Sequence, residues 1–286
     1  MTGFARTADP LPPAATARLV ALREHAGAAA GSYLYEGTTT VASWHRHDVH
    51  QLEYAFEGVV EVETAAARYR LPSRQAAWIP AGLAHVSSFD RARTVSVFFD
   101  PTLVRDTAGR VRVLPVEPVI REMIIYASRW PIGRLASDAV ADSFFDALAN
   151  LVLERLDHER PFYLPASPDP LITAVMRYTD DHLAATSLAE VCRTVSVSER
   201  TLRRRFHAAT GMTWRQYLLH SRMLHAMTLL IQSDNTVLGV ATAVGFDSAS
   251  AFSRAFRAYA GQTPTAFRLE RLGTPLSVND QELLAE

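Results

Sequence analysis

The sequence of 286 residues contains one cysteine, no lysine and no apolar run as long as a membrane span. The single Cys192 excludes an internal disulfide framework and any metal cluster built only from cysteines. A transmembrane helix needs about 20 consecutive apolar residues, so no span is predicted. The first thirty residues lack a continuous apolar core, so we expect no signal peptide and a cytoplasmic location. The apolar fraction of 48% is too high for a disordered chain.

All 29 basic side chains are arginines, and they are unevenly distributed although the formal net charge is only −1. Residues 170–272 contain twelve arginines and seven acidic residues. A locally basic segment is typical of a protein with a nucleic-acid partner. Because lysine is absent, every cationic contact can be made by a fork-shaped guanidinium.

The spacing of apolar residues changes several times along the chain. The first thirty residues are rich in alanine and proline, with one short predicted helix near residues 16–25. Short β-branched and aromatic runs between turn residues follow, which favours a small sandwich or barrel. Helical spacing dominates from Pro115 onward, with a proline-rich linker at residues 161–170. The predicted segments are an N-terminal extension (1–30), a β-rich domain (31–105), a helical linker (106–169), a helical domain (170–272) and a tail (273–286).

One helical stripe in the linker has two possible partners. Val140, Phe144, Leu148 and Leu156 recur at helical spacing after Ser137, a plausible N-cap. The stripe is predicted either to form a dimer seam or to pack on the β-rich domain, and the sequence favours neither.

Two stretches about fifty residues apart predict helix-turn-helix motifs. In each, an apolar stripe is followed by a turn, by a serine that can cap a second helix, and by a polar or cationic outer face. Two such second helices can enter consecutive major grooves, about 34 Å apart on one side of a duplex. The side chains predicted to face outward are Arg200, Arg203 and Arg204 in the first motif, and Ser250, Ser253, Arg254 and Arg257 in the second.

These motifs resemble the DNA-binding domain of the AraC/XylS family of bacterial transcription regulators, over about a third of the chain. The resemblance places Arg200, Arg203 and Arg204 at base-facing positions in the first reading helix. In the second helix the counterparts include Ala249, which is too small to hydrogen-bond a base edge. The matching residues are Ser198, Leu202, Arg204 and Phe206, Gly211–Thr213, Arg222, Ala241, Gly245-Phe246, Ser250, Phe252, Phe256, Gly261–Pro264 and Phe267-Arg268.

A second constellation lies in residues 44–53 and 78–85. If the first stretch is a strand, His45, His47, Gln51 and Glu53 share one face. The Pro-x-Gly turn before His85 can bring that imidazole back over the strand. Three imidazoles at one place are a typical ligand set for a transition metal.

This pair of stretches resembles the two motifs of the cupin superfamily, a small β-barrel. The resemblance implies that His45, His47 and His85 hold a divalent ion such as nickel, cobalt, zinc, copper or iron. Cupins have glutamate where this chain has Gln51, whose amide oxygen is a poor ligand for most of these metals. Glu53, two residues further on, is the alternative. The same residues are equally compatible with a pocket for an organic effector, and a structural hydrogen-bonded cluster is the third alternative.

The predicted fold class is α+β multidomain, with an N-terminal cupin-like β-barrel, a helical linker and a C-terminal all-α tandem helix-turn-helix domain. We expect a regulator that binds double-stranded promoter DNA, senses a small molecule or metal, and forms a homodimer. RNA polymerase would be a partner of an activator. The alternative is a cupin-type metal-dependent enzyme fused to a DNA-binding domain, which the missing glutamate disfavours.

Overall fold

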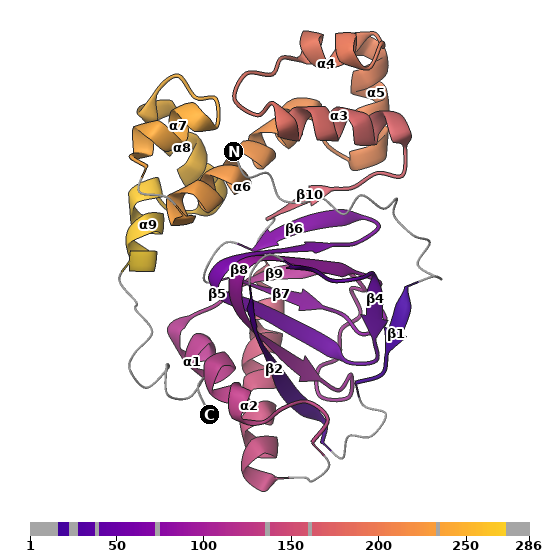
Figure 1. Ribbon diagram of the computed structural model, residues 1–286, viewed down its shortest axis with the longest axis vertical. Coiled ribbons are helices and arrows are strands. Elements are labelled where there is room, and N and C mark those ends of the chain that lie inside the picture. Colours follow the sequence, from indigo (N-terminus) through magenta and orange to yellow (C-terminus); the bar gives the residue numbers. More distant parts are fainter. Residues whose placement is uncertain are drawn as a thin grey trace. The chain divides into compact units, whose positions relative to one another are not determined.

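The computed structural model describes residues 17–22, 28–37, 40–71, 75–134, 138–159, 162–232 and 235–272 (Figure 1). The chain forms two compact units. The first comprises Met1–Thr64, Tyr69–Pro161 and Leu276–Glu286, and the second comprises Ala65–Arg68 and Phe162–Pro275. Within the described ranges, none of the helices combines the length and the apolar character that a membrane crossing requires.

The first unit is built on a mostly antiparallel sheet in which β8 pairs with β2, β3 and β5, and β5 and β9 both pair with β7. A separate parallel ladder joins β1 to β4. Among the described strands the pairings do not close into a ring, so the predicted cupin-like barrel is not confirmed. The strands are β1 (Arg18–Val20), β2 (Ala30–Gly37), β3 (Thr40–Val41), β4 (His45–His47), β5 (His50–Glu63), β6 (Ala67–Leu71), β7 (Gln75–Ile79), β8 (Val86–Phe99) and β9 (Arg112–Pro115).

Two of these strands differ from the sequence prediction. Arg18–Val20 form β1 where a short helix was predicted, because they pair with residues 45–47, far away in the sequence. Arg112–Pro115 form β9 inside the predicted helical linker and pair with β7. Strands of three or four residues are too short for a period-two pattern to reveal them.

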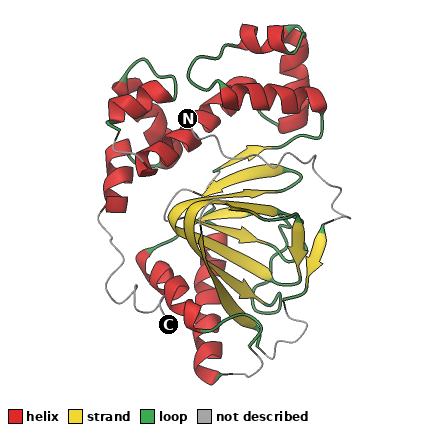
Figure 2. Ribbon diagram, viewed as in Figure 1, coloured by secondary structure: helices red, strands yellow, loops and turns green. Residues whose placement is uncertain are grey.

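The two faces of the sheet carry different chemistry because successive side chains alternate. Leu52 and Tyr54 on β5 belong to one buried apolar cluster together with Val97 and Phe99 on β8. Figure 2 shows helices covering this face of the sheet. The opposite face of β5 carries Gln51 and Glu53.

Helices α1 (Pro118–Tyr126) and α2 (Ala139–Leu156), with the short 3-10 helix η2 (Ala127–Arg129), complete the apolar cluster. The buried face of α2 contains Phe145, Leu148 and Val152 and packs on the sheet. Of the predicted stripe, Leu148 and Leu156 are buried on this face and Phe144 is partly buried. Asp138 caps α2 by accepting from the Val140 and Ala141 amides, whereas the predicted cap Ser137 lies outside the described residues. Val140 itself is 68% exposed.

The second unit is helical, and α6 runs between the group α3–α5 and the group α7–α9 (Figure 1). A buried cluster joins the first group to α6 through Val175, Val191, Leu202, Phe206 and Tyr217. The elements are β10 (Tyr163–Pro165), α3 (Pro170–Asp181), α4 (Leu188–Thr194), α5 (Glu199–Thr210), α6 (Trp214–Gln232), α7 (Val237–Ala243), α8 (Ala249–Ala260) and α9 (Pro264–Leu272).

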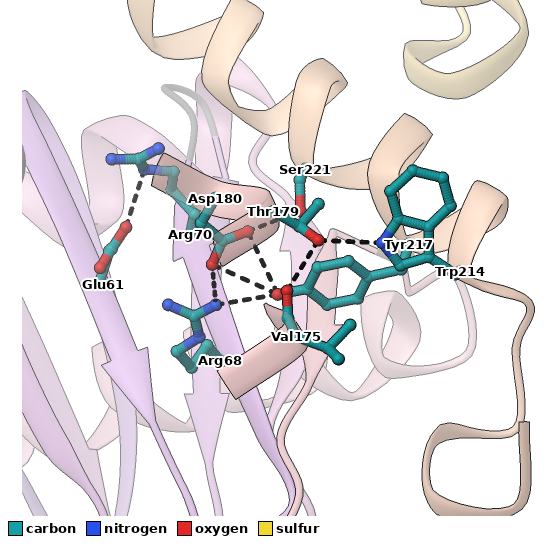
Figure 3. Close-up of polar contacts among 9 residues, drawn as sticks. All are labelled: Glu61, Arg68, Arg70, Val175, Thr179, Asp180, Trp214, Tyr217 and Ser221. Carbon is teal, nitrogen blue, oxygen red and sulfur yellow. Dashed lines mark hydrogen bonds and ion pairs between the residues drawn. The ribbon is translucent and has the colours of Figure 1, made fainter. Parts of the chain in front are cut away.

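A polar cluster inside the second unit is centred on Asp180 at the end of α3 (Figure 3). Its carboxylate accepts from Arg68 Nη2 at 2.5 Å, from Tyr217 Oη at 3.2 Å and from Ser221 Oγ at 3.1 Å. Nearby, Trp214 Nε1 donates to Thr179 Oγ1 at 2.9 Å. These bonds join α3 to α6 and to residues 65–68.

We expect Arg68→Ala to destabilise this cluster, because Asp180 then loses its bond from the Arg68 guanidinium. The loss of a hydrogen-bonded charged partner typically costs about 1–3 kcal/mol. Hydrogen exchange of the α3 and α6 amides measures the effect locally. Arg70→Ala is the control, since Arg70 pairs with Glu61 in the first unit at 2.9 Å. Equal exchange rates in the Arg68 variant and the wild type would contradict the prediction.

Candidate functional site

The two helix-turn-helix motifs, α4–α5 and α7–α8, are built alike. The second helix of each begins at a serine whose hydroxyl accepts from an amide three residues on, Ser198 at 3.3 Å and Ser248 at 3.2 Å. Each helix ends at a left-handed glycine, Gly211 with φ 71° and Gly261 with φ 79°. Caps at both ends define the length of the two helices.

The inward faces of α5 and α8 also correspond, at a spacing of fifty residues. Leu202 and Phe206 on α5 are fully buried, as are Phe252 and Phe256 on α8. This burial fixes the rotation of each helix about its axis. Residues at the intervening positions are consequently turned toward solvent.

The turns before these helices share a left-handed residue but differ in chemistry. Ser196, with φ 53°, is the sole non-glycine residue with positive φ in the described part of the chain. Gly245 takes the same place in the second motif with φ 80°. The next amide bonds back to the first helix in both motifs, from Val197 to Cys192 O at 3.0 Å and from Phe246 to Ala241 O at 2.9 Å.

The outer face of α5 is cationic, as the sequence predicts. Arg200, Arg203 and Arg204 are exposed and line one surface depression together with His207. Arg203 Nη2 also contacts Glu199 Oε2 one turn earlier, at 2.8 Å. A fork-shaped guanidinium on such a face can bind guanine or phosphate.

The outer face of α8 has fewer charges. Ser250, Arg254 and Arg257 are exposed, while Ser253 is half-buried. Arg204 and Arg254 occupy equivalent positions fifty residues apart, whereas Ser250 stands where the first motif has Arg200. The structure therefore puts every predicted DNA-binding residue on one of the two second helices.

One neighbouring arginine has a different role, which the sequence analysis missed. Arg205 forms a two-pronged ion pair with Asp169, with its Nη2 atom 2.7 Å from Oδ2. Asp169 is also the N-cap of α3. These bonds lower the pKa of Asp169 and fasten α5 to α3. Helical spacing was the available signal, because Arg205 points about 100° away from Arg204.

In the first unit, the structure brings the three predicted histidines together. Their candidate ligand nitrogens all lie within 4.8 Å of one another. Backbone bonds join the two histidine segments directly, since the His45 amide donates to His85 O at 3.0 Å and the His85 amide to His45 O at 2.9 Å. The Gly82 amide donates to His47 O at 2.7 Å, which folds the turn onto β4.

The backbone orients each imidazole. Nδ1 of His45, His47 and His85 lies 2.8, 2.7 and 2.9 Å from the carbonyl oxygens of Ser43, Val49 and Leu83 respectively. Because a carbonyl only accepts, these contacts favour the tautomer with the proton on Nδ1 and the lone pair on Nε2. In His47 they compete with Gln51 Oε1, a second acceptor, 2.8 Å from Nε2. Burial lowers the pKa of His47, and lowers that of His85 to about 3, so both rings are neutral near pH 7. Neutral imidazoles oriented in this way are typical metal ligands.

Comparison with known proteins identifies the helical part. A sequence-family profile described as a helix-turn-helix domain matches residues 191–270. The HTH-type transcriptional regulator NimR of Escherichia coli strain K12 is 28% identical over 256 residues, which are 87% of this chain and 90% of NimR. Residues 191–270 are a helix-turn-helix domain. The relatives support a DNA-binding transcription regulator.

Two further proteins are similar to this chain. The MmsAB operon regulatory protein of Pseudomonas aeruginosa is 28% identical over 235 residues, 78% of this chain and 76% of that protein. A solved transcriptional regulator from Chromobacterium violaceum, described by its AraC-type DNA-binding domain, is 27% identical with a TM-score of 0.35. That match covers 37% of this chain and 96% of the solved chain.

Within the helix-turn-helix domain and the loop before it, Arg222 on α6 contacts two separate segments. Its Nε donates to Leu183 O at 2.9 Å, and its guanidinium lies 5.8 Å from the centre of the Phe246 ring. The loop before α4 and the turn of the second motif are thereby joined through one side chain.

Gln51 and Glu53 are placed differently from each other. Gln51 Oε1 lies 2.8 Å from His47 Nε2, at the histidine cluster. Glu53 instead meets Gln51 Nε2 and Ser96 Oγ, and burial raises the pKa of its carboxyl group. Glu53 therefore contacts Gln51 instead of the imidazoles, and Gln51 lies beside His47. Ser96, on the neighbouring strand, had no signal in the sequence.

Proposed function

We propose that the chain is a sequence-specific transcription regulator whose first unit senses a divalent metal ion at His45, His47 and His85. The observation that supports the proposal is the convergence of three imidazoles whose Nδ1 atoms are all bonded to backbone carbonyls. His85 is fully buried, and its Nε2 has no hydrogen-bond partner. A buried lone pair without a donor is costly unless a cation binds it.

The donor set fits a transition metal better than calcium or magnesium. Imidazole nitrogen suits zinc, copper, iron and nickel, whereas hard cations prefer oxygen. Gln51 Oε1 is the candidate fourth donor. The bound ion would connect β4, β5 and the turn at residues 80–85, which lie apart in the sequence. Such a connection regulates DNA binding only if the ion binds one functional state of the regulator more tightly.

DNA recognition is assigned to α5 and α8. We propose that Arg200, Arg203 and Arg204 read base edges and bind phosphates in one major groove. The outer face of α8, which has fewer charges, contacts the next major groove through Ser250, Ser253, Arg254 and Arg257. The proposal includes the predicted homodimer, for which the exposed Val119 and Val140 offer apolar surface. The relatives named as regulators favour this function over the predicted alternative, a cupin-type enzyme.

Calorimetric titration of the full chain with nickel, cobalt, zinc and copper tests the sensor. We expect at least one ion to bind with micromolar or tighter affinity and to change the mobility shift of a bound duplex. His47→Ala is expected to leave DNA affinity nearly intact and to abolish this response, because it removes a ligand far from α5 and α8 in the sequence. Absence of heat and of any mobility change with all four ions would reject a metal effector and leave an organic one.

A further inference from the structure

Glu53 is a buried acidic residue for which the described residues provide no cationic partner. Its side chain is 1% exposed. Gln51 Nε2 and Ser96 Oγ both donate to Glu53 Oε2 at 2.6 Å, and the Thr94 hydroxyl also stabilises the charged form, whereas Oε1 is buried without a well-aligned hydrogen bond. A carboxylate removed from water is costly unless donors or a positive charge compensate for the lost solvation. These donors compensate for only part of this cost.

The bonds around Glu53 fix the orientation of the Gln51 amide. Gln51 Nε2 has two hydrogens, and its two acceptors are Glu53 Oε2 at 2.6 Å and Ser96 Oγ at 2.9 Å. Turning the amide over would place Oε1 against the carboxylate, so that two acceptors would face each other at that distance. Glu53 therefore directs the amide oxygen away from itself and toward His47.

At the other end of the amide, the His47 ring meets an acceptor on each side. Gln51 Oε1 lies 2.8 Å from its Nε2 atom, and Val49 O lies 2.7 Å from its Nδ1 atom. A neutral imidazole has one N–H, so one of the two contacts brings two lone pairs together, and with the proton on Nδ1 that contact is the one to Gln51. A lone pair on nitrogen and one on oxygen are stabilised together when both bind a single cation. His45 and His85 direct their nitrogens to the same place.

We infer that Glu53 is a positioning residue of the metal site and acts through Gln51. Its carboxylate holds the amide so that Oε1 becomes the fourth ligand, and its negative charge offsets that of the ion. In this chain the ligand is therefore an amide that hydrogen-bonds a carboxylate, in place of a carboxylate that ligates the ion directly. The inference rests on the proposed function, because it requires that the three histidines bind the ion. Partners that orient a ligand typically change metal affinity by about 10–100-fold.

The first test compares the zinc and nickel affinities of the wild type and Glu53→Gln, measured by competition with a chromophoric chelator. The substitution keeps the shape of the side chain and removes its charge. We expect affinity to fall by about 10–100-fold. Ser32→Ala is the matched control, because Ser32 is also buried but bonds Ala127 O at 2.7 Å instead of the histidine cluster. The control is expected to bind both ions as the wild type does.

The second test removes the need for an oriented amide. In Gln51→Glu, a carboxylate ligates directly, and either of its oxygens can face the ion. Adding Glu53→Gln to that variant removes only a charge near the site, so metal affinity should fall less than it does in the Gln51 background. A purely structural role for Glu53 would lower metal affinity equally in both backgrounds. Thermal melting of the metal-free variants measures stability separately.

The outcomes separate the two proposals. If the wild type binds neither ion, the proposed metal sensor fails and this inference falls with it. If the wild type binds and Glu53→Gln binds equally well, the inference alone is overturned. Should Glu53→Gln not fold, Gln51→Glu with and without Glu53→Gln decides, because the metal affinities of these two variants must differ by less than about tenfold. A larger loss would overturn the inference.

Discussion

Gly245→Ala is expected to destabilise the second unit by about 3 kcal/mol or more, through backbone strain together with steric overlap. Gly245 has φ 80°, and a Cβ atom built on it would overlap Ala184 O and approach Arg222 Nη2 to 2.6 Å. The carbonyl is backbone and moves only with the loop before α4. Arg222 is held by its bond to Leu183 O at 2.9 Å, so it yields at the cost of that contact.

Positive φ alone does not account for this glycine. The first motif accepts Ser196 at the equivalent place with φ 53°, so a side chain is compatible with the turn itself. The difference lies in what covers the turn. Gly211 separates the two contributions, because it has φ 71° with no atom within 4 Å of a Cβ position. Gly211→Ala should therefore cost only about 1 kcal/mol, the conformational contribution.

Urea unfolding of the two variants, followed by hydrogen exchange of the α7 and α8 amides, measures the difference. A reduction in duplex affinity is expected to accompany Gly245→Ala, because α8 is positioned by this turn. If both alanine variants are destabilised equally, the overlap with Ala184 and Arg222 is relieved at no cost and the explanation is wrong.

The sequence predicted the helical half well because its signals are local. Ser248 caps α8 as predicted, and of the two serines that could cap α5, Ser196 and Ser198, the structure uses Ser198. Leu202, Phe206, Phe252 and Phe256 form the buried faces, as their helical spacing predicts. Each of these features depends on residues within about two turns of a helix. The ion pair of Arg205 could not be predicted from local signals, because its partner Asp169 lies 36 residues away.

In the histidine cluster, too, local features could be predicted from the sequence and long-range contacts could not. Alternation along a strand correctly placed His45 and His47 on one face, and the turn brings His85 to them through two backbone bonds. The orientation of the rings depends on Ser43, Val49 and Leu83 carbonyls, which any residue type supplies. No side-chain pattern reveals such bonds. The Glu53–Ser96 contact spans 43 residues and follows from the β5–β8 register, which the sequence does not specify.

Arg204→Lys is expected to relax base preference at one position while keeping most of the electrostatic affinity. Lysine keeps the positive charge but cannot make the two parallel hydrogen bonds of a guanidinium. Such a two-pronged contact to guanine is worth about 1–3 kcal/mol of discrimination between bases. Arg204→Ala should lose both contributions, with affinity reduced about 10–100-fold and a smaller salt dependence. Selection from a randomised duplex library, combined with salt titration of the selected sequence, measures preference and affinity separately.

Arg205→Ala is the matched control for this series, because it removes the same charge from the adjacent position. Arg205 is paired with Asp169 through both prongs of its guanidinium, so it is not available to read a base. The control should therefore select the same sequence as the wild type. If Arg204→Lys also selects the wild-type sequence at full affinity, Arg204 binds phosphate and reads no base. The reading role on α5 would then belong to Arg200 and Arg203, the other two exposed arginines of that face.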